Sequence, residues 1–149
     1  METEKPPSNP IHPDFWKLID DLMPYMESLI VSGSVTPFCA YLGKDKKTSL
    51  LNVVLARKDG KNDFMTLMES MKDALRKAVT ESNAKATSIF YTGFGTPPNQ
   101  NDEKRAVIVA LDSIEGQSIS LVFAFEVKDG SVSFMERWYI DGDHEIFSP

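Results

Sequence analysis

The densest group of side chains that could do chemistry lies near the C-terminus. Residues 141–145 read Asp-Gly-Asp-His-Glu, which places three carboxylates and one imidazole within five residues. Carboxylate oxygens and imidazole nitrogens can bind a divalent cation. The spacing does not match a calcium loop, because the EF-hand pattern continues Asp-x-Asp-x-Asp-Gly. We therefore predict a solvated tail without a metal site, and the metal candidates are limited to Asp141, Asp143 and His144.

Cysteine, histidine and glycine do not form a recognisable catalytic or nucleotide-binding motif. His12 and His144 are the only histidines and lie at opposite ends of the chain, while the single cysteine, Cys39, lies in an apolar stretch. A buried thiol without an activating neighbour is inert. Gly93-Phe-Gly95 is not followed by a helical pattern and fails as a nucleotide fingerprint. We predict no catalytic residue and no cofactor, which argues against an enzyme.

Glu136 is a carboxylate that the predicted register places among aromatic side chains. It lies between Phe134 and Trp138 and faces Phe123. A carboxylate in such a place must be paired, protonated or at the rim of the sheet. A functional acid is one reading, and a local bulge or an end position beside a helix lysine is the other. If Glu136 is functional, it is a possible ligand-binding residue. Tyr91 and Arg137 are the other two possible ligand-binding residues.

Four strands fill the second half of the chain, at residues 86–94, 104–112, 117–127 and 131–140. Each run is rich in β-branched and aromatic residues, and turn residues separate each run from the next. The pattern predicts one antiparallel meander.

The last hairpin has a turn that fixes its register. Asp129-Gly130 suits a two-residue type I′ turn, because both residues tolerate positive φ. This turn pairs Phe125 with Phe134 and, further along, Leu121 with Trp138.

The preceding hairpin suits a three-residue loop, 114–116, with Gly116 in the left-handed conformation. Val109 then pairs with Leu121. The two registers give the sheet a heavy face, the face of Val109 and Leu121, and an opposite light face. The heavy face is expected to carry Val107, Val109, Leu111, Ile119, Leu121, Phe123, Phe125, Val132, Phe134 and Trp138. The light face is expected to carry Ala106, Ile108, Ala110, Ser118, Ser120, Val122, Ala124, Met135, Arg137 and Tyr139.

The first helix is predicted from Pro13, which suits a first turn, to the residues before Gly33. Apolar residues recur at helical spacing through this stretch. Pro24 removes one backbone hydrogen bond, so we expect a kink or split near residues 20–21.

A hairpin of residues 35–42 and 48–56 follows, and then a second amphipathic helix. Asn62 or Asp63 can cap this helix, and Asn83 can end it in the left-handed conformation.

These elements predict an α+β fold in the order α-β-β-α-β-β-β-β. We expect a single antiparallel sheet of about six strands, with both main helices packed on the heavy face. Joining the first hairpin to the last strand suggests the order 2-1-6-5-4-3. Residues 1–12 are polar and hold three prolines, so they are expected to form a flexible N-terminal arm before one domain at 13–149.

The order of elements resembles that of profilin-like and roadblock-like domains, which implies a fold and no activity. A second resemblance rests on Pro37-Phe38-x-Ala40-x-Leu42, on Asp102-Glu-Lys-Arg-Ala-Val107 entering a strand, and on Ile146-Phe147. These motifs resemble a family of small bacterial proteins without assigned function. Members of that family tend to carry an acidic residue near Arg105, where this chain departs, and the resemblance supplies no catalytic residue.

Length and charge restrict the function classes. The chain has 149 residues, a net charge of −6 and one cysteine. No basic cluster is present to neutralise phosphates, which argues against nucleic acid and against an anionic membrane surface. No apolar run approaches the roughly 20 residues that span a bilayer. The N-terminus lacks the profile of a signal peptide, so we predict a cytoplasmic protein.

These features predict a small acidic protein-binding or adaptor module of the immunity or chaperone kind, acting through the uncovered light face. A homodimer is the favoured assembly. The expected contact residues are Ile108, Val122, Met135, Arg137 and Tyr139. The alternative is an enzyme or small-ligand-binding protein, with a pocket between residues 95–103 and the C-terminal tail.

Overall fold

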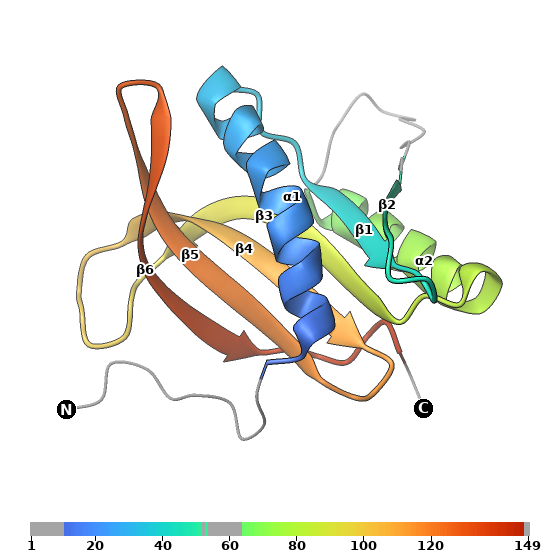
Figure 1. Cartoon of the computed structure of the whole chain (residues 1–149). Coiled ribbons are helices and arrows are strands. Elements are labelled where there is room, and N and C mark those ends of the chain that lie inside the picture. The colour runs from blue at the N-terminus through green and yellow to red at the C-terminus, as the bar shows by residue number, and fades with distance from the viewer. Residues whose placement is uncertain (1–10, 52, 54–63, 148–149) are drawn as a thin grey trace.

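The computed structural model describes residues 11–51, 53 and 64–147, which form two helices and one antiparallel sheet of six strands (Figure 1). The helices are α1 (Pro13–Ser32) and α2 (Phe64–Ser82). The strands are β1 (Phe38–Leu42), β2 (Thr48–Leu51), β3 (Ala86–Gly95), β4 (Lys104–Ser113), β5 (Ser118–Lys128) and β6 (Ser131–Asp141). The predicted α+β fold is confirmed.

Three expectations fall partly or wholly on residues outside the described ranges. They are the arm at residues 1–10, the end of the second strand beyond Leu51, and the cap at Asn62 or Asp63.

The strands lie in the order β2-β1-β3-β4-β5-β6, so the suggested order 2-1-6-5-4-3 is wrong. β1 pairs with β3 instead of β6, with Phe38 opposite Phe90 and Leu42 opposite Ala86. The two phenyl rings stack with their centroids 4.9 Å apart. α2 carries the chain from the first hairpin to β3, and Lys85 N donates to Leu42 O at the start of the new strand. This connection puts β3 beside β1.

The two helices lie on opposite faces of the sheet, which corrects the expectation that both cover the heavy face (Figure 1). α1 covers the heavy face, where its buried Phe15, Leu18 and Met26 belong to the main core with Val109 and Leu121. On the light face, the stripe of α2 packs over β1 and β3. The buried residues beneath α2 form a second hydrophobic cluster, which contains Cys39, Met71, Leu75, Ile89 and Ile146.

α1 is positioned by its N-terminus and runs unbroken through Pro24. His12 caps the helix, since Asp14 N donates to its Nδ1 at 3.0 Å, and His12 N donates to Gln117 Oε1 at 2.8 Å. His12 is therefore anchored to the loop between β4 and β5 rather than belonging to an arm. Pro24 is solvent-exposed, so its ring and the lost hydrogen bond lie away from the core, and the expected split is absent.

The registers of both hairpins follow their turns as predicted. Val109 lies opposite Leu121 in β4 and β5, and Phe125 lies opposite Phe134 in β5 and β6. Gly116 has φ +100°, which confirms the left-handed loop residue.

Beyond Phe125 a β-bulge shifts the register by one residue on β6. Phe123 faces Arg137, Val122 faces Trp138 and Leu121 faces Tyr139, so the predicted pairing of Leu121 with Trp138 is wrong. A shift of one residue moves every later side chain to the other face of a sheet. Trp138 therefore lies on the light face, while Arg137 and Tyr139 lie on the heavy face.

Candidate functional site

The five predicted contact residues do not share one surface. Val122 is buried with 2% of its surface exposed, and with Trp138 it forms a small light-face cluster that includes Ile108 at its margin. Tyr139 packs against the main core on the other face, and Arg137 lies over the ring of Trp16. α2 covers the part of the light face above β1 and β3. The expected open light face is thus covered in part within the monomer, while Ile140 at the end of β6 remains 54% exposed.

The outer edge of β6 is the longest edge of the sheet that the structure describes. β6 has 11 residues and lies at the end of the strand order, so within the described part of the chain it pairs with β5 alone. Such an edge leaves backbone N–H and C=O groups free to pair with another chain. Ile140 on this strand is 54% exposed, and Met135 at the bulge is 41% exposed.

A groove of about 550 Å³ runs between α1 and β6 on the heavy face. Its apolar walls include Trp16, Met23, Phe123, Phe134 and Met135. A second hollow of about 590 Å³ continues toward the hairpin tip at 130–132, and Glu27 lines both. Two of the predicted contact residues, Met135 and Arg137, line the groove between α1 and β6.

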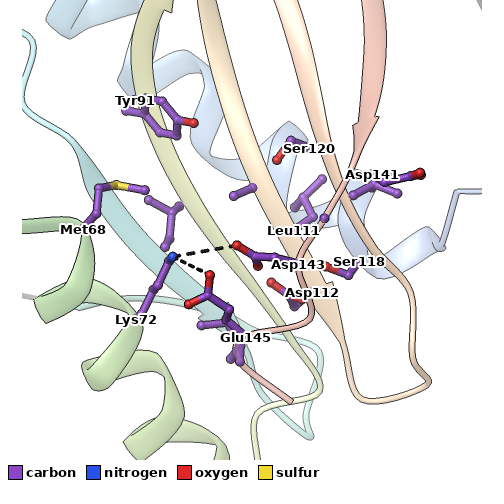
Figure 2. Close-up of a pocket in the computed structure, with 15 residues that line it drawn as sticks. Met68, Lys72, Tyr91, Leu111, Asp112, Ser118, Ser120, Asp141, Asp143 and Glu145 are labelled. Carbon is purple, nitrogen blue, oxygen red and sulfur yellow. Dashed lines mark hydrogen bonds and ion pairs between the residues drawn. The ribbon is translucent and has the colours of Figure 1, made fainter. Parts of the chain in front are cut away.

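A separate cavity of about 250 Å³ lies on the light face beneath the C-terminal tail (Figure 2). The strands β3, β4 and β5 form its floor, α2 forms one wall, and residues 141–146 cross over it. Tyr91 lines this cavity as a predicted ligand residue, whereas Glu136 and Arg137 lie elsewhere. The loop at 95–103 does not line it, so the position predicted for the pocket is only partly right.

The tail is held across the light face, so it is not a free segment, while Asp141, Asp143 and His144 stay solvent-exposed as predicted. Lys72 Nζ of α2 lies 3.0 Å from Glu145 Oε1, and Arg76 Nε donates to the backbone oxygen of Glu145 at 2.8 Å. His144 N donates to Ser118 Oγ at 3.1 Å. Ile146 is 6% exposed and belongs to the cluster beneath α2.

The predicted metal candidates are not brought together. In Figure 2 the carboxylate of Asp141 points away from the cavity, toward the other side of the tail. His144 lines a different hollow, near Val79 and Ile114. Within the described residues, no three histidine, cysteine, aspartate or glutamate side chains are grouped so that they could hold a metal ion.

Asp112 is the buried acid at the floor of the cavity, with 8% of its surface exposed. Burial raises its pKa, and a hydrogen bond from Ser118 offsets this only in part. The charges of Asp143 and Glu145 raise the pKa of Asp112 further, whereas the charge of His144 lowers it. Burial also raises the pKa of Tyr91.

Lys72 supplies the positive charge of the cavity. Burial alone would lower the pKa of Lys72, but the hydrogen bond to Glu145 and the charges of Glu145, Asp143 and Glu69 raise it overall. Lys72, Asp112 and Glu145 were not predicted as site residues. Lys72 and Glu145 lie 73 positions apart in the sequence, so no local pattern joins them.

Glu136 lies at the β-bulge of β6, which is one of the positions that the sequence suggested for it. It lies at the bulge, where one carboxylate oxygen accepts a hydrogen bond from Gln100 Nε2 at 3.2 Å. The other oxygen is buried without a partner among the described residues. The bulge reading of Glu136 therefore matches its position.

Comparisons with known proteins do not identify a relative. No model of a protein family matches the chain, and neither a curated protein nor a solved structure matches it. Neither described helix is long and apolar enough to cross a membrane. The two resemblances drawn from the sequence stay predictions.

Proposed function

We propose that the protein is a protein-binding module that associates through the outer edge of β6, with a second copy of the chain as its partner. The observation that carries this proposal is the outer edge of an 11-residue strand, which has no partner strand among the described residues and lies beside an apolar groove. Edge strands invite pairing with another chain unless they are covered, twisted away or charged. The bulge near Met135 disrupts the middle of β6, so the proposed pairing uses residues 137–141.

The sequence of this segment is complementary to itself. A twofold axis perpendicular to the sheet pairs two copies of β6 antiparallel and keeps each face on the same side. With Tyr139 on the axis, Arg137 faces Asp141 of the partner subunit, and Trp138 faces Ile140 of the partner subunit. Arg137, Tyr139 and Asp141 all lie on the heavy face, as such a pairing requires.

Neighbouring registers lose this match. Centred on Trp138, the pairing sets Arg137 against Tyr139 of the partner subunit. Centred on Ile140, it sets Asp141 against Tyr139 of the partner subunit. Opposite charges directly across a ladder are favourable and like charges are not, which favours the register centred on Tyr139.

A charge swap tests the proposal by light scattering. The parent protein should be a dimer at tens of micromolar, and Arg137→Glu should be a folded monomer because two acidic side chains then face each other. Asp141→Arg alone should also give a monomer, and the double variant should restore the dimer. Both side chains are exposed, so the swap spares the core, unlike a change of buried Val122.

Lys128→Glu is the matched control, since Lys128 is an exposed cation at the hairpin tip outside residues 137–141. It should remain a dimer. A monomeric parent, or a double variant that stays monomeric, would contradict the proposal.

A further inference from the structure

The cavity beneath the tail is a partly open site with two unlike sides. Ser118, Ser120 and Asp112 place oxygen atoms along its floor, and Met68, Ile89 and Ala110 give it an apolar side. Tyr91 points into it from β3 (Figure 2). A water takes about 30 Å³ of liquid, so 250 Å³ leaves room for a molecule of roughly eight non-hydrogen atoms.

The charge of the cavity is negative. Three carboxylates face it, those of Asp112, Asp143 and Glu145, against the one ammonium group of Lys72 (Figure 2). That ammonium group is already held by Glu145 at 3.0 Å and lies 3.9 Å from Asp143. Among the described residues, no lysine or arginine forms an ion pair with Asp112. A buried carboxylate without a cation is costly, and a bound cation would remove that cost.

A second buried group lies beside Asp112 on the same face. Thr87 is the cross-strand partner of Asp112 in β3 and β4, and it is 1% exposed. Its hydroxyl oxygen has no hydrogen-bond partner among the described residues. Buried hydroxyl groups normally have a partner, so this part of the light face is strained in its polar contacts. Thr87 is not among the residues that line the cavity, so its hydroxyl group is a neighbour of the site and not a contact for its occupant.

We infer that this cavity binds a small organic cation, a primary amine or guanidine with a short apolar stem. The cationic group lies against Asp112 and donates to its carboxylate and to the hydroxyl oxygens of Ser118 and Ser120. The stem packs against Ile89 and Met68. An acid deep in a partly apolar cavity selects for positive charge, while the apolar side selects against a bare ion.

A divalent metal ion is the less suitable occupant. The described residues offer no group of three metal-ligating side chains, and Asp141 points out of the cavity (Figure 2). An anion would meet three carboxylates, and a neutral molecule would leave Asp112 without a cation in direct contact, since His144 acts on it only through its charge.

Isothermal titration calorimetry with butylamine and agmatine tests the inference on the full chain. Both amines should bind saturably at millimolar concentration or below. Butanol, butyrate and magnesium chloride alone should give no saturable heat. Binding should weaken at least tenfold in Asp112→Asn, because the counter-charge is lost. Asp129→Asn, the same change at the hairpin tip, should bind like the parent.

Ser120→Leu keeps the test decisive if Asp112→Asn fails to fold. This variant retains all the charges and fills the cavity, so it should abolish amine binding. Titration of the Arg137→Glu variant separates the two proposals, because a monomer should still bind the amines. The inference is overturned if neither amine binds, if magnesium binds instead, or if Ser120→Leu binds amines like the parent.

Discussion

Asp112 is a carboxyl group that the folded protein keeps at a cost to its stability. Burial raises its pKa above the usual range, and the hydrogen bond from Ser118 does not fully offset burial. A carboxyl group whose pKa is raised by folding favours the folded state at low pH. That contribution is lost as the pH rises through the folded-state pKa. Residues of this kind gather at functional sites, which agrees with a binding role for the cavity.

Asp112→Asn should therefore be more stable than the parent at pH 7. Asparagine has nearly the same shape, can still accept from Ser118, and carries no charge to bury. The difference in the free energy of unfolding should shrink as the pH falls through the folded-state pKa of Asp112, and it should be small well below about 4, where both proteins are neutral at this position. Urea denaturation at pH 7 and at pH 3 measures this. A variant less stable than the parent at pH 7 would show that the ionised carboxylate stabilises the fold.

Cys39 is predicted to be unreactive in the folded protein. It lies in β1 with 0% of its surface exposed, and burial raises the pKa of its thiol to about 12. Because the thiolate is the nucleophile, a disulfide reagent at pH 8 should react slowly in buffer and fast in concentrated urea. Equal rates in the two solutions would mean that β1 opens readily or that the thiol is accessible.

At the scale of elements, alternation and turn residues were sufficient to predict β3 to β6. The runs of β-branched and aromatic residues are bounded by Gly116 and by Asp129-Gly130, and both turns have the expected left-handed residues. Helix α2 ends as predicted before Asn83, which has φ +54°. These signals come from residues that are close together in the chain, so they can be recognised in the sequence alone.

The bulge in β6 could not be predicted in the same way. Apolar and polar residues stop alternating here, because Phe134 and Met135 are followed by Glu136 and Arg137. This break alone does not fix the register, since either register places an aromatic residue on the heavy face. What separates the registers is long-range packing. Trp138 fills the light face beside Gly95, where an added Cβ would lie 2.9 Å from the indole ring. Arg137 instead reaches Trp16 of α1, with its guanidinium carbon 5.0 Å from the ring centre.

Strand order and the cavity were missed for a related reason. Both depend on α2 crossing the light face, which brings Lys72 to the tail and sets β3 beside β1. The sequence did place Tyr91 and the acidic tail among the candidates. Nothing in the sequence marked Asp112 as a site residue, because a polar residue at the end of a strand is common.

The bulge makes Trp138 the anchor of the light-face cluster, and Trp138→Ala tests this. The indole is 7% exposed and packs with Val122, Ala106 and Ala124, so its removal should cost about 3–5 kcal/mol in the free energy of unfolding. Phe123 is partly exposed beside the groove, and Phe123→Ala should cost less. Urea denaturation of both variants gives the comparison. The reverse ranking would contradict the shifted register.

At the scale of the whole molecule, the described residues form a six-stranded sheet with α1 and α2 on opposite faces and β6 at one edge (Figure 1). The cavity lies at the tail beneath α2, and the proposed pairing lies along residues 137–141. Asp141 belongs to both regions, but its carboxylate points away from the cavity (Figure 2). The two proposed activities therefore use different side chains and can be tested one at a time.

Association through β6 predicts that thermal stability depends on protein concentration. A partner that binds only the folded chain stabilises it by mass action, so the Tm of a dimer rises with concentration, while that of a monomer does not. The parent should show a rising Tm across a hundredfold range of concentration, from about 1 to about 100 μM. Arg137→Glu should show a constant Tm, and Arg137→Glu with Asp141→Arg should regain the rise. Arg137 also contacts Trp16, so its replacement lowers the Tm itself by a fixed amount. The slope with concentration therefore reports association, and a parent with no slope would show that β6 does not pair with a second copy.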